Sequence, residues 1–264
     1  MNTLIQKLAR NEVLLGLFCC SYSTQVAEAL AHSGYDYLLF DAEHTPSSLP
    51  HLHAQLLALA GSGTQAVIRV AGLDLASFKL YADLGVDGLM LPNVHDAATA
   101  ERAASYLRYP PLGIRGVAGS VRALRYGRQA VRDADTAPRP ALIVQAESTA
   151  GVDRAHDIAS VDGVDAVFFG PNDLAADMGL LGQPSHPRVV ERIEQGIAAV
   201  RRAGKPAGIL ASEADCPRYA AAGARLVAAG SDLGLLVKSA DGLAARLRPA
   251  LGAQSSTQLQ RDPS

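Results

Sequence analysis

The chain has 264 residues, of which 48% are hydrophobic, and a formal net charge of −2. This length and apolar content suffice for one large domain with an extensive core, and the near-neutral charge argues against a nucleic-acid partner. No apolar run is long enough to span a bilayer, and residues 1–10 lack the apolar stretch of a secretory signal, so we expect no membrane partner. The three cysteines (Cys19, Cys20 and Cys216) fit no metal-binding spacing, which predicts reduced thiols in a cytoplasmic protein.

Short apolar runs alternate along the chain with segments of helical period. The apolar runs predict strands at residues 13–19, 35–41, 65–70, 88–92, 141–144, 164–169, 206–211 and 225–229. The helical period predicts helices at residues 24–32, 49–60, 75–84, 97–107, 150–159, 186–202, 213–222 and 233–247. A long connection at residues 108–140 contains a further expected helix near 121–131, and connections of this length are usually functional.

The predicted strands are apolar on both faces, as the buried strands of a parallel sheet are. Eight strand–helix units within about 250 residues are typical of a (β/α)8 TIM barrel. We therefore predict an α/β fold with a single barrel domain at residues 1–247 and a polar, disordered tail at residues 248–264. A doubly wound open sheet is the alternative, but no glycine-rich dinucleotide loop follows the first strand.

Charged side chains follow four of the predicted strands. They are Asp41, Glu43 and His44 after the second strand, Arg69 at the end of the third, Glu147 after the fifth and Asp173 after the sixth. In a barrel these strand ends meet at one face, where the loops build the active site. Two facing carboxylates repel each other unless a positive group lies between them, so Glu147 and Asp173 predict a divalent cation with oxygen ligands. Two unrelated surface acids, one of them a helix cap, are the alternative.

The lysines distinguish between two kinds of aldolase chemistry. None of Lys7, Lys79, Lys205 and Lys238 falls at the carboxyl end of a predicted strand, so a Schiff-base mechanism lacks its nucleophile. The sequence also has no nucleophile elbow and no phosphate loop. The remaining possibility is enolate chemistry, in which a metal and Arg69 hold the developing negative oxygen and His44 transfers protons.

Several longer runs resemble one enzyme family. They are LLFDAEHTP at residues 38–46, VIRV at 67–70, RYPPLGIRGV at 108–117, LIVQAES at 142–148 and VDAVFFGPNDLAADMG at 164–179. On these runs the chain is identified as a member of the HpcH/HpaI family of class II, metal-dependent 2-oxo-acid aldolases. The runs ESTAGVD at 147–153 and GSDLG at 230–234 are more similar to the 2-dehydro-3-deoxy-glucarate aldolase branch than to the homoprotocatechuate-pathway branch, which cleaves 4-hydroxy-2-oxo-heptanedioate.

The resemblance implies an assembly and a reaction centre. It implies that the last helix is exchanged between subunits, usually in a hexamer built as a trimer of dimers. It implies Mg2+, Mn2+ or Co2+ held by Glu147 and Asp173. It further implies that His44, oriented by Asp41, acts as a base through a bound water, and that Arg69 stabilises the pyruvate enolate.

The resemblance also assigns substrate contacts. It implies substrate binding by Gln145, by the backbone amides around Asn172 and by Leu210, and a contribution from Asp83 to the site of a neighbouring subunit. Two departures from the family are small and apolar: alanine stands at position 42 for the usual glycine, and at position 146 for the usual isoleucine. Residues 118–128 are less typical of the family, and we expect them to shape the pocket for the aldehyde half of the substrate.

The expected reaction is reversible retro-aldol cleavage of a 4-hydroxy-2-oxo acid, such as 2-dehydro-3-deoxy-glucarate or 4-hydroxy-2-oxo-heptanedioate, to pyruvate and an aldehyde. One alternative is an acyl-CoA lyase of the malyl- or citramalyl-CoA type, for which the basic stretch at residues 122–132 is the candidate phosphate contact. Another is a non-catalytic barrel that binds a metal and an oxo acid, which is disfavoured because every expected site group is present.

Overall fold

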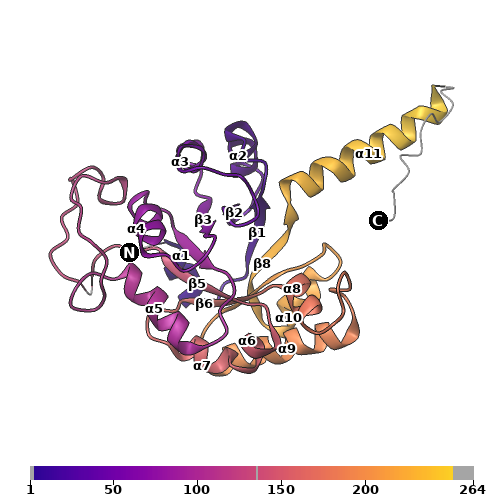
Figure 1. Ribbon diagram of the computed structural model, residues 1–264. Coiled ribbons are helices and arrows are strands. Elements are labelled where there is room, and N and C mark those ends of the chain that lie inside the picture. The colour runs from indigo at the N-terminus through magenta and orange to yellow at the C-terminus, as the bar shows by residue number, and fades with distance from the viewer. Residues whose placement is uncertain (1–2, 135, 252–264) are drawn as a thin grey trace.

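The barrel prediction is confirmed. The structure is a computed structural model that describes residues 3–134 and 136–251. Eight parallel strands pair in chain order and close on themselves, which rules out the open sheet (Figure 1). The strands are β1 (Leu14–Cys19), β2 (Tyr37–Asp41), β3 (Gln65–Arg69), β4 (Gly88–Leu91), β5 (Ala141–Ala146), β6 (Ala166–Phe169), β7 (Ala207–Leu210) and β8 (Ala224–Ser231).

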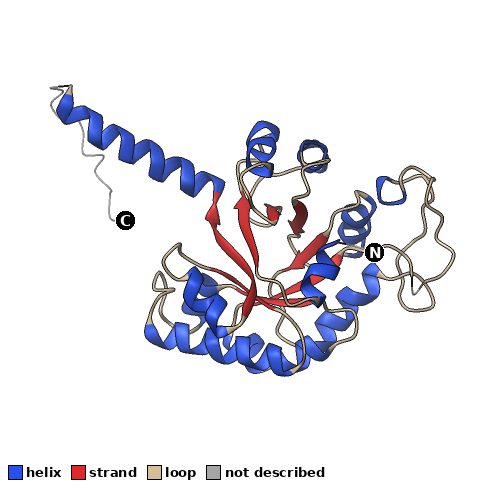
Figure 2. Cartoon of the chain, turned by 180° about the vertical axis from the view of Figure 1, so that it is seen from behind, coloured by secondary structure: helices blue, strands red, loops and turns tan. Residues whose placement is uncertain are grey.

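Most of the helices surround the strands on the outside of the barrel (Figure 2). The described helices are α1 (Thr3–Ala9), α2 (Thr24–Ala31), α3 (Leu49–Ala58), α4 (Leu75–Asp83), α5 (Ala97–Leu107), α6 (Thr149–Asp153), α7 (Ala155–Ser160), α8 (Pro171–Asp177), α9 (Pro187–Arg202), α10 (Cys216–Ala222) and α11 (Asp232–Ala250). No helix in the described ranges is long and apolar enough to cross a membrane. All three cysteines carry free thiols.

Two layers of apolar side chains explain why the strands are hydrophobic on both faces. One core lies between the strands and the outer helices. The other fills the barrel, where Phe18, Val67 and Met90 pack with Leu4 and Leu8 of α1. Helix α1 therefore closes the amino-terminal end of the barrel, and the carboxyl end is left for the loops that build a site.

The connection between α5 and β5 differs from the prediction. A helix is expected near residues 121–131, but only a single 3-10 turn, η1 (Arg122–Leu124), forms there. Arg125, Tyr126 and Gly127 follow with φ angles of 50°, 56° and 87°. Three consecutive left-handed residues reverse the chain and prevent a helix from continuing.

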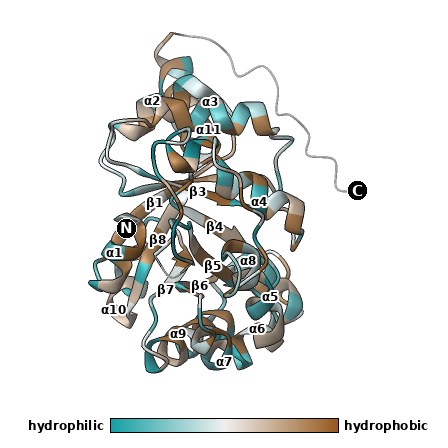
Figure 3. Ribbon diagram, turned by 90° about the vertical axis from the view of Figure 1, so that its left-hand side faces the viewer, coloured by the Kyte–Doolittle hydropathy of each residue, from teal (hydrophilic) through white to brown (hydrophobic). Residues whose placement is uncertain are grey.

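Two further differences concern the helices. The helix expected at 150–159 is divided into α6 and α7, and the short helices α1 and α8 were not predicted. Helix α11 continues to Ala250, past the predicted end of the domain at residue 247; residues 252–264 of the predicted tail lie outside the described residues. Helix α11 extends away from the barrel (Figure 1). Hydrophobic and hydrophilic residues both occur along it (Figure 3), and its Leu236 and Val237 are exposed.

Candidate active site at the carboxyl ends of the strands

A buried ion pair links the ends of β2 and β3. The parallel register places Asp41 opposite Arg69, and Arg69 binds both oxygens of Asp41, with Nε at 2.9 Å and Nη2 at 2.8 Å. The guanidinium also lies 3.2 Å from Oε2 of Glu43 and 5.1 Å from the centre of the Phe18 ring. These contacts fix the plane of the guanidinium and leave further N–H donors for a ligand.

The ion pair sets the charge of the two acids beside it. Burial raises the pKa of Asp41, but the hydrogen bonds and charge of Arg69 outweigh burial and bring that pKa below its ordinary value. Burial raises the pKa of Glu43 despite the nearby Arg69. Asp41 is therefore ionised at neutral pH, and Glu43 holds its proton more firmly than an ordinary glutamate.

Glu147, directly after β5, is buried and held at both oxygens. Its Oε1 accepts a hydrogen bond from the backbone N–H of Asn93 at 2.9 Å, and its Oε2 accepts a short one from the amide of Gln145. Burial raises its pKa to about 7, and the charges of Asp173 and Glu43 add to this shift. Glu147 therefore lies among like charges that the Asn93 amide and Arg69 compensate only in part.

Gly170 explains how β6 comes so close to these groups. A Cβ atom at this position would lie 2.5 Å from Oε2 of Glu147 and 2.8 Å from Nε2 of Gln145, so any larger residue would displace these two side chains. The residues after Gly170 begin α8, and Asn172 and Asp173 are exposed in its first turn. The GPND run thus brings the second acid to the edge of the site.

The imidazole of His44 occupies a different place from the one expected. Both oxygens of Asp41 bind Arg69, and only the backbone N–H of His44 reaches Asp41, at 3.4 Å. The side chain of His44 is 65% exposed, and its Nε2 lies 3.6 Å from Oε2 of Glu43. In the structure Glu43, and not Asp41, is the acid beside the imidazole.

The remaining predicted residues are distributed as follows. Gln145 belongs to the buried centre of the site, and Leu210 is half-buried at the end of β7. Asp83 does not join the site of its own chain, because it ends α4 and forms a 2.7 Å ion pair with the buried Arg115. Sequence reasoning gave no role to Asn93, although its position directly after the fourth predicted strand was a usable signal.

Glu147 and Asp173 are the groups that could hold a metal. Within residues 3–134 and 136–251, no three His, Cys, Asp or Glu side chains form a ready-made metal cluster. The chemistry of the donors nevertheless fits a divalent cation with oxygen ligands. Burial raises the pKa of both Glu147 and Glu43, and the charge of Asp173 adds to both shifts. The buried Oε1 of Gln145 has no hydrogen-bond partner in the described part of the chain. A cation and its ligands would offset this repulsion.

Residues 14–239 match the family described as HpcH/HpaI aldolase/citrate lyase. The chain belongs to this family. The resemblance noted in the sequence is therefore confirmed, and the HpcH/HpaI match covers every residue of the site from Asp41 to Leu210.

Relatives within the family are similar over nearly the whole chain. A 5-keto-4-deoxy-D-glucarate aldolase of Klebsiella pneumoniae is 41% identical over 238 residues, covering 90% of this chain and 93% of its own. A pyruvate aldolase of Rhizobium etli is 39% identical over 247 residues, covering 93% and 97%. The crystal structure of an HpcH/HpaI aldolase/citrate lyase family protein from Burkholderia cenocepacia has a TM-score of 0.88 and 38% identity, covering 94% of this chain and 100% of its own.

The less typical segment at residues 118–128 does not lie at the site of its own chain. The guanidinium of Arg122 donates hydrogen bonds to the backbone oxygens of Leu84 at 2.7 Å and Gly85 at 3.4 Å, just after α4. In this HpcH/HpaI chain the segment is thus packed beside α4 and the amino end of β4. The expectation that it shapes the aldehyde pocket finds no support within one subunit.

Proposed function

We propose that the protein is a class II pyruvate aldolase that reversibly cleaves a 4-hydroxy-2-oxo acid to pyruvate and an aldehyde. One observation carries the proposal: a fixed Arg69–Asp41 pair stands beside the acids Glu147 and Asp173 at the carboxyl end of a barrel. The four lysines lie elsewhere, in α1, in α4, before β7 and in α11, so Schiff-base chemistry has no nucleophile at the site. The names of the relatives from Klebsiella and Rhizobium support the same reaction class.

The proposed substrate is a six-carbon keto-deoxy sugar diacid of the 2-dehydro-3-deoxy-glucarate type. Such a diacid would give pyruvate and a three-carbon aldehyde acid. The relatives named as 5-keto-4-deoxy-D-glucarate aldolases support this choice over 4-hydroxy-2-oxo-heptanedioate.

The residues have separate tasks in this proposal. A Mg2+, Mn2+ or Co2+ ion held by Glu147 and Asp173 would supply Lewis-acid polarisation of the 2-oxo group. Gln145, the amides around Asn172 and the apolar Leu210 bind and orient the substrate. Gln145 lies in β5, Asn172 in the first turn of α8 after β6, and Leu210 at the end of β7, so all three come from the carboxyl side of neighbouring strands.

Proton transfer and charge stabilisation belong to His44 and Arg69. His44, through a water molecule, removes the proton of the C4 hydroxyl, and the C4 oxygen becomes the aldehyde oxygen as the C3–C4 bond breaks. The electron pair of that bond forms the enolate, whose oxygen Arg69 binds, and the enolate then takes a proton at C3. Asp41 keeps Arg69 in place, and Glu43 stands beside His44.

We further propose that α11 is exchanged between subunits in a hexamer built as a trimer of dimers. The 19-residue helix extends from the barrel, and Leu235, Leu236 and Val237 on it are 42–63% exposed. Apolar surface of this kind is usually covered in an assembly. In the assembly Asp83 is proposed to reach the site of a neighbouring subunit. The free thiols agree with a cytoplasmic location.

The test measures pyruvate release, coupled to lactate dehydrogenase, with and without excess EDTA. Substrates are 2-dehydro-3-deoxy-glucarate, 4-hydroxy-2-oxo-heptanedioate and malyl-CoA. We expect metal-dependent release from the first, and slower release from the second. Release that survives EDTA would refute the metal step. Cleavage of malyl-CoA alone would favour the acyl-CoA lyase, and no cleavage by a folded, metal-binding protein would favour the non-catalytic barrel.

A further inference from the structure

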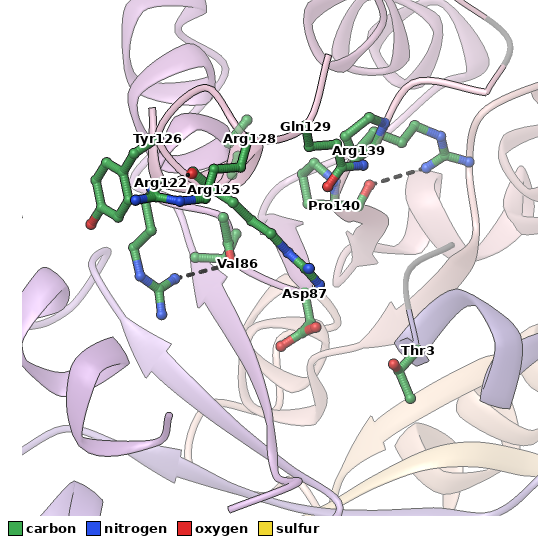
Figure 4. Close-up of a pocket in the computed structure, with 14 residues that line it drawn as sticks. Thr3, Val86, Asp87, Arg122, Arg125, Tyr126, Arg128, Gln129, Arg139 and Pro140 are labelled. Atoms are coloured by element: carbon green, nitrogen blue, oxygen red, sulfur yellow. Dashed lines mark hydrogen bonds between the residues drawn. The ribbon is translucent and has the colours of Figure 1, made fainter. Parts of the chain in front are cut away.

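A cavity lies at the opposite end of the barrel from the candidate active site. It encloses about 580 Å3 between Val86 and Asp87 before β4, Pro140 before β5, Thr3 of α1 and the turn that follows η1 (Figure 4). Because its walls precede the strands, the cavity belongs to the amino-terminal end of the barrel. Its volume is in the range of small-molecule sites.

The lining of this cavity is strongly basic. Arg122, Arg125, Arg128 and Arg139 line it, and Asp87 is the one carboxylate among its described lining residues (Figure 4). Arg139 forms an ion pair with Asp165, which is not a lining residue; its Nη1 lies 2.6 Å from Oδ2 of Asp165. The other three arginines form no ion pair with a carboxylate in the part of the chain that the structure describes. The cavity therefore holds more positive charge than its own acid can balance.

Two of the three arginines of the turn donate hydrogen bonds to the backbone, and Arg125 and Arg128 are exposed. Arg122 is anchored on the backbone oxygen of Leu84 at 2.7 Å, and Arg128 donates to the backbone oxygen of Arg125 at 3.1 Å. Arg125 itself ends η1 in the left-handed region, with φ 50°. No described residue accepts a hydrogen bond from its guanidinium, so its donors are free for a ligand.

We propose that this cavity binds a small, multiply charged anion that carries a phosphate or several carboxylates. Guanidinium groups bind both kinds of oxyanion through paired, charge-assisted hydrogen bonds. Arg125 and Arg128 supply the contacts, and Arg122 holds the turn against the end of α4. This cavity does not bind the phosphate of a CoA thioester whose reacting end lies at Glu147 and Asp173 of the same chain. Those two carboxylates lie at the opposite end of the barrel. The proposal does not rest on the aldolase activity.

Calorimetric titration of the full-length protein tests the site. Inorganic phosphate and succinate are each titrated into protein saturated with Mg2+ and pyruvate, so that competition at the carboxylates is limited. The double variant Arg125→Gln/Arg128→Gln is expected to bind the preferred anion at least about tenfold more weakly than wild type. The matched control is Arg102→Gln, which changes an exposed arginine of α5 and should bind as wild type does. The preferred probe identifies the ligand as a phosphate or a polycarboxylate.

A measurement on the unmodified protein guards against misfolding of the variant. Hydrogen–deuterium exchange with and without the preferred anion should show protection of the amides at residues 121–129. Equal binding by the double variant, absence of binding of both probes to the wild type, or protection confined to residues 170–174 would each overturn the proposal.

Discussion

Glu147 is a buried acid among like charges, and its replacement by glutamine tests the electrostatics of the site. In the metal-free protein, burial, together with the charges of Asp173 and Glu43, raises its pKa from 4.5 to about 7. Above that pH the folded protein holds a carboxylate in an unfavourable place, whereas the unfolded chain ionises it freely. We therefore expect Glu147→Gln to stabilise the metal-free protein and, at the same time, to abolish activity.

The size of the gain follows from the pKa shift. A shift from 4.5 to about 7 corresponds to about 3 kcal/mol in the free energy of unfolding at pH 8. The folded state binds the proton of Glu147 more tightly than the unfolded state does. The wild type therefore loses stability as the pH rises from 4.5 to about 7. Glutamine can still accept the hydrogen bond from Asn93, and its NH2 group can face the partnerless Oε1 of Gln145 once that amide turns. The substitution therefore leaves one polar atom of Gln145 unpaired, as in the wild type, but that atom is then Nε2 and no longer Oε1.

Urea unfolding of the EDTA-treated wild type and Glu147→Gln measures the difference in their free energies of unfolding. Both proteins are unfolded at the same concentration, at pH 8 and at pH 5. The variant should be more stable at pH 8, and most of its advantage should disappear at pH 5. The control Glu101→Gln changes an exposed acid of α5 and should show no such dependence. Added Mg2+ should stabilise the wild type but not Glu147→Gln. The reasoning is wrong if the variant is no more stable at pH 8 or gains equally at both pH values.

Three further predictions concern the ion pair, the close approach of β6 and the last helix. Arg69→Ala should lower the free energy of unfolding by about 3–5 kcal/mol, because it leaves Asp41 buried and unpaired; Arg69→Met/Asp41→Asn should recover stability in urea but not pyruvate release. Gly170→Ala should lower the free energy of unfolding by about 1–3 kcal/mol, since its Cβ would lie 2.5 Å from Oε2 of Glu147. The same variant should bind Mg2+ more weakly in a calorimetric titration. The control Gly72→Ala, which has open space around it, should change neither quantity. Leu236→Glu should reduce the oligomer seen by sedimentation, because it charges a 63% exposed position on α11; an unchanged oligomer would count against helix exchange.

The barrel could be predicted because its strands follow a strong physical rule. A parallel strand covered on both faces is mostly apolar, and β2 and β5, which are buried at every position, each begin with four apolar residues. Any polar residue that ends such a strand then stands out. Asp41, Arg69 and Glu147 were found in this way, and the register places the first two opposite each other.

The turn after η1 could not be predicted from its residues alone. The sequence of residues 121–131 is compatible with a helix, but Arg125 and Tyr126 adopt left-handed conformations that cost free energy in isolation. Contacts from Arg122 to the backbone after α4 hold the segment in place. Such tertiary contacts between distant parts of the chain override local preference, and no window of sequence contains them.

Within the site, the sequence alone likewise does not determine which acid pairs with Arg69. Position alone placed Arg69, Asp41, Glu43 and His44 at one face, but it did not determine which acid binds the arginine and which lies beside the imidazole. The β2–β3 register decides the first, because it sets Asp41 directly opposite Arg69. The chain then turns outward, so His44 meets Glu43.

The division of charge in the site gives a reason for two separate positive groups. Arg69 is committed to Asp41 by two hydrogen bonds, so it lowers the pKa of Glu147 too little to offset burial and the neighbouring acids. The proposed cation would supply a second positive group beside Glu147 and Asp173 without a further buried side chain. Without this cation, an anionic oxo acid would meet the acids Glu43, Glu147 and Asp173. We therefore expect pyruvate to bind the metal-loaded protein far more tightly than the metal-free protein.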